Sequence, residues 1–147
     1  MSRCTMPPAC TVASAAQIWS TIDLSERQRS RSSQLNHADC YALYWHAHAR
    51  FREWTPEGNR EAIRLCARIE AIEPGNVLVS ALAGFCNGVA CQAGWADDPA
   101  ASRAAAVRHL QFALATDPNN VEVLGYAAGT MVSIGGDMRV ADRLIDR

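Results

Sequence analysis

The chain has 147 residues, of which 49% are hydrophobic and 20% are charged, and its formal net charge is -1. This length allows one domain with a hydrophobic core, and the balanced charge gives no electrostatic basis for nucleic-acid binding. No segment approaches the roughly 20 apolar residues of a membrane span, so we expect a cytoplasmic protein without a membrane partner.

Residues 1–11 contain a Pro-Pro pair and no periodicity, so we expect a disordered tail. Residues 12–34 predict an amphipathic helix and a linker, with arginines gathered at the helix end, where they complement the dipole. Because no aromatic residue is interleaved with these arginines, a solvated helix end is favoured over a nucleic-acid patch. The apolar positions of this helix are Ala15, Ile18, Trp19 and Ile22.

A second helix is predicted to begin near Ala38, and Thr55 and Pro56 then indicate the start of a third, as a cap and a first helical residue. Pro74-Gly75 ends that helix, and Asn76 can cap the next one. The apolar faces are predicted to hold Tyr41, Tyr44, Ala47, His48 and Phe51 in the first of these helices, and Ala62, Ile63, Cys66, Ile69 and Ile72 in the second.

The rest of the chain repeats this arrangement. A helix is predicted from about Val77 to Cys91, followed by a long loop over residues 92–99 that contains Trp95. Further helices follow over residues 100–116, about 121–132 and 138–147, each preceded by cap residues. The inward positions are predicted to be Leu78, Leu82, Phe85 and Val89, and then Ala106, Val107, Leu110, Ala113 and Leu114.

Two segments 44 residues apart, AIEPGNVLVSALA around Pro74 and ATDPNNVEVLGYA around Pro118, match at six positions and indicate an internal repeat. In this register the chain resembles the tetratricopeptide repeat, a 34-residue helix-turn-helix. The second repeat departs from the pattern, because its internal turn is about ten residues too long and Ser80 and Asn87 replace large residues. The matching positions are Tyr44, Ala47, His48, Phe51, Ala62, Cys66, Ile69 and Pro74; then Ser80, Ala83, Gly84, Asn87, Ala106, Leu110, Ala113 and Pro118; and finally Leu124, Ala127, Ala128, Met131, Ala141 and Ile145.

The resemblance implies an all-α fold, a tetratricopeptide-like α-hairpin superhelix of about 2.5 repeats preceded by one amphipathic helix. The repeat domain would span residues 35–147, with repeats at about 39–76, 77–120 and an incomplete one at 121–147.

A narrower likeness concerns the segments GWADDPAASRAAA and GGDMRVADRLIDR. They look like the C-terminal tetratricopeptide region of bacterial adenylate/guanylate cyclase-like proteins and winged-helix regulators. The exclusive use of arginine among the 14 basic residues also indicates a GC-rich bacterial genome. The likeness implies a regulatory region of a signalling protein, and since the chain contains neither a cyclase domain nor a winged helix, we expect no enzyme activity.

Tetratricopeptide arrays bind peptides on a concave surface, so the resemblance implies a protein or peptide partner. Trp45 and Phe85 are the candidate anchors, with packing against the amphipathic helix of residues 12–34 as the alternative. The lysine and asparagine clamp by which some members of the family hold a C-terminal carboxylate is absent, which disfavours chaperone-tail binding. The lining positions would be Trp45, Arg52, Leu78, Phe85, Glu122 and Val132.

The sequence gives little support for chemistry. His46 and His48 are two residues apart and face apart on a helix, so we expect no metal site with His37 and Cys40. His109 has no recognisable nucleophile partner, and no phosphate-binding loop is present, so catalytic residues and cofactors are also expected to be absent. The six cysteines form no C-x-x-C pair and are interpreted as reduced thiols, most of them in the core.

Two other functions remain open. The Trp95 loop and the aromatic groove suggest a small-ligand sensor. Because the chain ends inside the last predicted helix, it could instead be a truncated remnant of a larger cyclase-like protein or transcriptional regulator. In that case an uncovered last hairpin would favour a homodimer. The residues expected to be incompletely covered are Val121, Leu124, Ile134 and Leu144.

Overall fold

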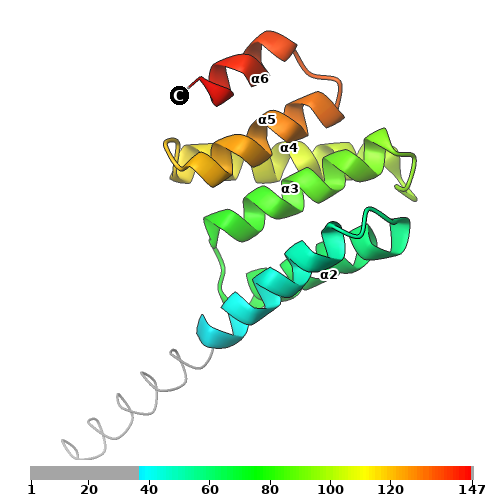
Figure 1. The fold of residues 1–147 in the computed structure, drawn as a ribbon, viewed down its shortest axis with the longest axis vertical. Coiled ribbons are helices and arrows are strands. Elements are labelled where there is room, and N and C mark those ends of the chain that lie inside the picture. Colours follow the sequence, from blue (N-terminus) through cyan, green and yellow to red (C-terminus); the bar gives the residue numbers. More distant parts are fainter. Residues whose placement is uncertain (1–36, 147) are drawn as a thin grey trace, which may run out of the picture. The chain divides into compact units, whose positions relative to one another are not determined.

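The computed structural model describes residues 37–146, and all regular elements in this range are α-helices. The first helix covers residues 37–51 and has no label in Figure 1. It is followed by α2 (Pro56–Ile72), α3 (Val77–Gln92), α4 (Pro99–Thr116), α5 (Val121–Ser133) and α6 (Met138–Ile145). The expected all-α class is confirmed, while the predicted tail and amphipathic helix of residues 1–34 lie outside the described residues. None of the helices in this range combines the length and apolar character needed to cross a membrane.

The five labelled helices begin where capping residues predict. Thr55 Oγ1 accepts a hydrogen bond from the Gly58 amide at 3.0 Å, and Asn76 Oδ1 accepts one from the Val79 amide at 3.2 Å. Asp98, Asn120 and Asp137 cap α4, α5 and α6 in the same way. Because each cap satisfies amides that lack a partner within the helix, these side chains fix the helix starts.

The helices pair as hairpins and pack in two layers. Figure 1 shows the first helix, α3 and α5 side by side, with α2 and α4 behind them. The central helix is α3, which packs against α2, α4 and α5. Small residues allow the close approach of α4, since a Cβ on Gly84 would lie 3.2 Å from His109 Cβ and 3.3 Å from the Ala106 carbonyl oxygen.

The buried stripe of the first helix contains Cys40, Tyr44, Ala47 and Phe51, at spacings of four, three and four. The prediction for Tyr41 was wrong, because this side chain is 66% exposed. One residue along an α-helix is a rotation of about 100°, which turns Tyr41 away from the face that Cys40 buries.

Most of the other predicted inward positions are buried or half-buried. Ile72 is the exception and is exposed, because it is the last residue of α2, just before the chain turns toward α3. Leu65 is an additional buried residue that the sequence pattern did not identify.

The C-terminal hairpin is better covered than expected. Leu124 and Ile134 are buried, which corrects the expectation that they remain uncovered. The reason is that α6 packs along α5, and the Arg103 guanidinium of α4 donates a hydrogen bond to the Ile134 carbonyl. Val121 is 84% exposed, as expected, and the Leu144 side chain lies outside the described residues.

Candidate functional site

The six predicted groove residues do not form one open surface. Four of them are accessible: Trp45, Arg52, Glu122 and Val132 are exposed side chains. Leu78 and Phe85 are partly buried and pack against the core.

Phe85 is a packing residue rather than an exposed anchor. Its ring centroid lies 5.2 Å from that of Phe51 on the first helix and 5.6 Å from that of Tyr126 on α5. Among residues 37–146, Phe85 therefore packs between Phe51 and Tyr126, while the expected amphipathic helix of residues 12–34 lies outside the described residues. Gly129 makes room for the ring, because a Cβ at this position would lie only 2.6 Å from a ring carbon of Phe85.

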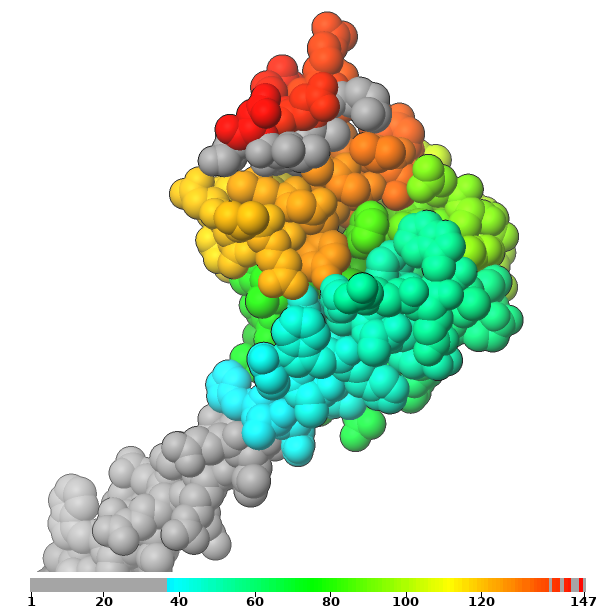
Figure 2. All heavy atoms as spheres, in the orientation of Figure 1, coloured from blue at the N-terminus to red at the C-terminus, as the bar shows by residue number. Residues whose placement is uncertain are grey.

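A hydrogen bond also connects the first helix to α5 next to this aromatic row. The Tyr44 hydroxyl donates to a carboxylate oxygen of Glu122. Burial, followed by this hydrogen bond, raises the pKa of Tyr44, so the phenol remains a donor, while burial raises the pKa of Tyr126 to about 12. Figure 2 shows the cyan first helix meeting the orange α5 on this face, so part of the expected groove is filled by the chain's own side chains.

A second aromatic group lies on the outer side of the first helix. Tyr41 and Trp45 are four residues apart, with ring centroids 6.0 Å apart in an edge-on arrangement, and Trp45 is 49% exposed. The His48 ring continues this row at 5.6 Å from the ring of Trp45. The row follows one helical stripe that is not used by the core.

A third aromatic group connects two turns that are distant in the sequence. The Trp54 and Trp95 rings meet edge-on with their centroids 6.1 Å apart, and Trp54 also contacts Phe51 at 5.5 Å. Trp54 is 58% exposed, yet its backbone adopts φ 54, the left-handed region. A non-glycine residue pays about 1–2 kcal/mol for this conformation. Strained backbone residues cluster at functional sites, so the left-handed conformation of this exposed tryptophan makes Trp54 a candidate site residue.

Trp95 is held by the backbone of its own loop. The amides of Trp95 and Ala96 both donate to the Ala90 carbonyl oxygen, at 2.9 Å and 3.1 Å, and Gly94 supplies the left-handed residue of the turn, with φ 70. The sequence identified Trp95 as unusual but did not identify Trp54. The position of Trp54 could have identified it, because it lies in the short turn of three residues between the end of the first helix and Thr55, which caps α2.

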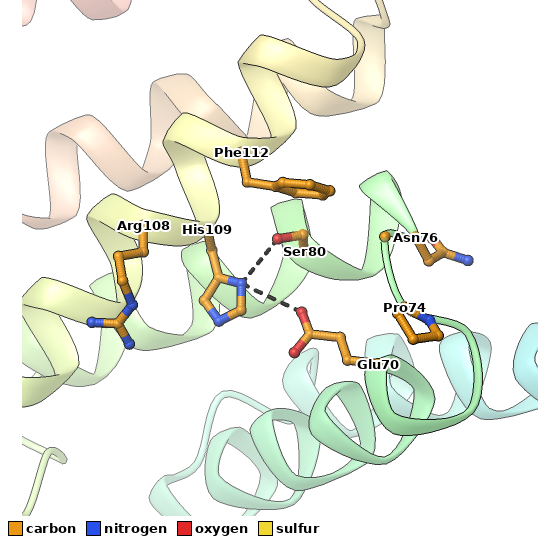
Figure 3. A pocket seen from close by; sticks show the side chains of 8 residues that line it. Glu70, Pro74, Asn76, Ser80, Arg108, His109 and Phe112 are labelled. Atoms are coloured by element: carbon orange, nitrogen blue, oxygen red, sulfur yellow. Dashed lines mark hydrogen bonds and ion pairs between the residues drawn. The ribbon is translucent and has the colours of Figure 1, made fainter.

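A pocket of about 330 Å³ lies between α2, α3 and α4, away from these aromatic groups. Figure 3 shows His109 of α4 pointing toward Ser80 of α3 and Glu70 of α2, with the Phe112 ring above them. His109 Nδ1 lies 2.9 Å from Ser80 Oγ and 3.4 Å from Glu70 Oε1. Sequence reasoning missed this cluster because its members come from three helices.

The cluster does not have the geometry of a nucleophilic triad. A triad uses opposite nitrogens of the histidine, one for the serine and one for the carboxylate. Here both Ser80 and Glu70 lie at the same nitrogen of His109. Because Glu70 does not lie at the opposite ring nitrogen, it cannot orient the histidine as the carboxylate of a triad does. The cluster therefore connects three helices without the geometry of a triad.

Within residues 37–146, no group of three or more His, Cys, Asp or Glu side chains is arranged to hold a metal ion. The cysteines in this range are free thiols; Cys40, Cys66 and Cys86 are buried, as the sequence indicated, and Cys91 is partly exposed. Burial raises the pKa of Cys66 to about 12 and that of Cys86 well above the ordinary value, so both thiols are protonated at neutral pH.

The accessible features of the described chain are thus the Tyr41–Trp45 row, the Trp54–Trp95 pair and the pocket beside His109. Comparisons with models of protein families, with curated proteins and with solved structures find no match for the chain. These three features are the basis on which a function is assigned.

Proposed function

We propose that residues 35–147 form a tetratricopeptide-like array of about 2.5 α-hairpin repeats, covering about 39–76, 77–120 and 121–147. The first helix with α2, α3 with α4, and α5 with α6 supply the hairpins. The small residues of the repeat pattern support the proposal because they are buried where helices approach each other. They include Ala47, Ala62, Ala83, Ala106 and Ala127.

The array is proposed to act as a non-catalytic protein-interaction scaffold, part of a bacterial signalling or regulatory protein. The observation that carries this function is the exposure of three large aromatic side chains on the first hairpin, namely Tyr41, Trp45 and Trp54. Tryptophan and tyrosine are enriched among the residues that dominate binding energy, because they bury a large area at a small entropic cost.

A random peptide library displayed on phage tests this function with the full chain as bait. The expected result is enrichment of a peptide consensus that binds the wild-type chain and binds more weakly when Trp45 or Trp54 is replaced by serine. Val121→Ser is the matched control, because Val121 is also an exposed apolar residue but lies at the start of α5. Selection of no peptide above background, or equal loss of binding in the control, contradicts the proposal.

The second candidate function is a small-ligand sensor, which the pocket beside His109 supports. Its volume of about 330 Å³ lies within the range of small-molecule sites. Arg108 lines it and has no ion-pair partner among residues 37–146, so its charge is available to a ligand. A thermal-shift screen of metabolites would detect such a ligand, with Phe112→Ala removing the exposed ring over the pocket as the control variant. A metabolite that stabilises the wild type and the Phe112→Ala variant equally would bind outside this pocket.

Homodimerisation through the C-terminal end remains a proposal with less support, because Leu124 and Ile134 are buried, while Val121 and Val132 are the exposed large apolar residues described on α5. Light scattering over a range of protein concentrations tests it. A dimer that persists in the Val121→Ser variant would place the interface on another surface.

A further inference from the structure

We propose that the Trp54–Trp95 corner binds a cationic side chain, arginine or lysine, of the partner peptide. This inference rests on the proposed interaction function and specifies the chemistry of one contact within it. The corner is formed by residues 52–55, which connect the first helix to α2, with the first turn of α2, and by residues 93–98, which connect α3 to α4. Figure 1 shows both connections at the same end of the helices.

The ring of Trp54 is exposed, whereas that of Trp95 is partly buried and packs against the core. Trp54 is more than half exposed, and no hydrogen-bond partner of either indole N–H lies among residues 37–146. The edge-on arrangement, with centroids 6.1 Å apart, places one ring face beside the edge of the other. Tryptophan faces attract cations through the ring quadrupole more strongly than the other aromatic side chains do.

Both turns are held in place, so that the corner exists before any ligand binds. Trp95 is fixed by the two amide hydrogen bonds to the Ala90 carbonyl oxygen. Trp54 packs on Phe51, a buried residue of the first helix, and the Thr55 cap follows directly. A preorganised site loses less entropy on binding than a mobile one.

The charges around the corner favour a cation. The two connections contain three carboxylates, Glu53, Asp97 and Asp98, and one basic residue, Arg52, and the first turn of α2 adds Glu57. Glu53 is paired with Arg50, and Asp98 accepts the amides of Ala100 and Ala101 as the cap of α4. Glu57 and Asp97 are exposed and have no partner among residues 37–146. They are therefore available to a cation that contacts the rings.

The test uses the full chain labelled with ¹⁵N at the tryptophan indoles, whose signals are assigned from single Trp→Phe variants. Two glycine-based peptides with acetylated and amidated ends serve as probes. The first contains two arginines. The second has citrulline in place of each arginine, because citrulline keeps the shape of the side chain but lacks its charge. The expected result is a saturable shift of the Trp54 and Trp95 signals by the arginine peptide, with about three- to tenfold weaker binding of the citrulline peptide.

Three variants complete the design. Trp54→Gly removes one ring and suits the left-handed backbone, so it is expected to abolish the shift of the Trp95 signal without unfolding the chain. Asp97→Asn is expected to weaken binding of the arginine peptide and to leave binding of the citrulline peptide unchanged. Val121→Ser changes an exposed apolar residue at the start of α5, outside the corner, and is expected to bind both peptides as the wild type does.

The proposal is overturned if the arginine peptide produces no saturable shift, if both peptides bind equally, or if the shifts appear at Trp45. The peptide library separates this failure from failure of the interaction function. A selected consensus without basic residues would leave the scaffold function intact and reject the cationic ligand, whereas the absence of any consensus would count against the scaffold itself.

Discussion

The hydroxyl of Tyr44 donates a hydrogen bond to the carboxylate of Glu122, which lies 78 residues further along the chain. Tyr44 is a buried residue of the first helix, whereas Glu122 lies in the first turn of α5. The bond therefore links the first and third hairpins directly, beside the row formed by Phe51, Phe85 and Tyr126. An array whose repeats contact only their neighbours would lack such a link.

Removal of this hydrogen bond is expected to destabilise the chain as a whole. Tyr44→Phe should lower the free energy of unfolding by about 1.5 kcal/mol, the lower end for a hydrogen bond to a charged group, because Glu122 is exposed to water. Urea unfolding of Tyr44→Phe, Glu122→Gln and the double variant measures the coupling between the two residues. If the effects of the two single variants simply add, the two side chains do not interact in solution.

Two glycines of α5 should respond in opposite ways to the same substitution. Gly129→Ala places a Cβ against the Phe85 ring, which cannot move freely because Phe51 and Tyr126 flank it, and we expect a loss of about 1–3 kcal/mol. Gly125→Ala meets nothing within 4 Å and should stabilise the helix by about 0.5–1 kcal/mol. Thermal or urea unfolding gives both values, and equal effects at the two positions would mean that Phe85 does not pack on α5.

Local chemistry made the helices predictable from the sequence. The cap at Asn76 and the Asp98-Pro99 pair each act within a few residues, so the sequence alone places the helix starts that they determine. The repeat register also located Ala47 and Ala106 in the core, because small residues at fixed spacing indicate helix contacts.

The site residues were less predictable because their partners are remote in the sequence. No periodicity connects Tyr44 to Glu122, or Glu70 to His109, and each pair meets only after the hairpins stack. The sequence left Phe85 between a groove anchor and a packing residue, because the register shows which face a residue occupies but not that a neighbouring ring, here that of Tyr126, will fill the space.

Stability should decline at alkaline pH partly because of the buried Cys66 thiol. Burial raises its pKa from the ordinary 9.0 to about 12, so the folded state keeps a proton that the unfolded chain releases above about pH 9. The stabilisation is complete below pH 9 and is lost as the pH rises toward 12, by at most about 1.4 kcal/mol per pH unit. Urea unfolding at about pH 8 and about pH 10.5 should therefore show a smaller decline for Cys66→Ala than for the wild type. An identical decline would indicate that water reaches this thiol in the folded chain.

The left-handed backbone of Trp54 gives the most direct test of the strained turn. Trp54→Ala and Trp54→Gly both remove the ring and its contacts with Phe51 and Trp95, so their difference reports the backbone alone. Only glycine adopts a positive φ without a steric penalty, and the glycine variant should be more stable than the alanine variant by about 1 kcal/mol, although glycine also gains more freedom in the unfolded chain. Urea unfolding of the two variants measures this difference. An alanine variant as stable as the glycine variant would show that the turn relaxes once the ring is gone, and the indole contacts themselves would then be what holds Trp54 in its strained conformation.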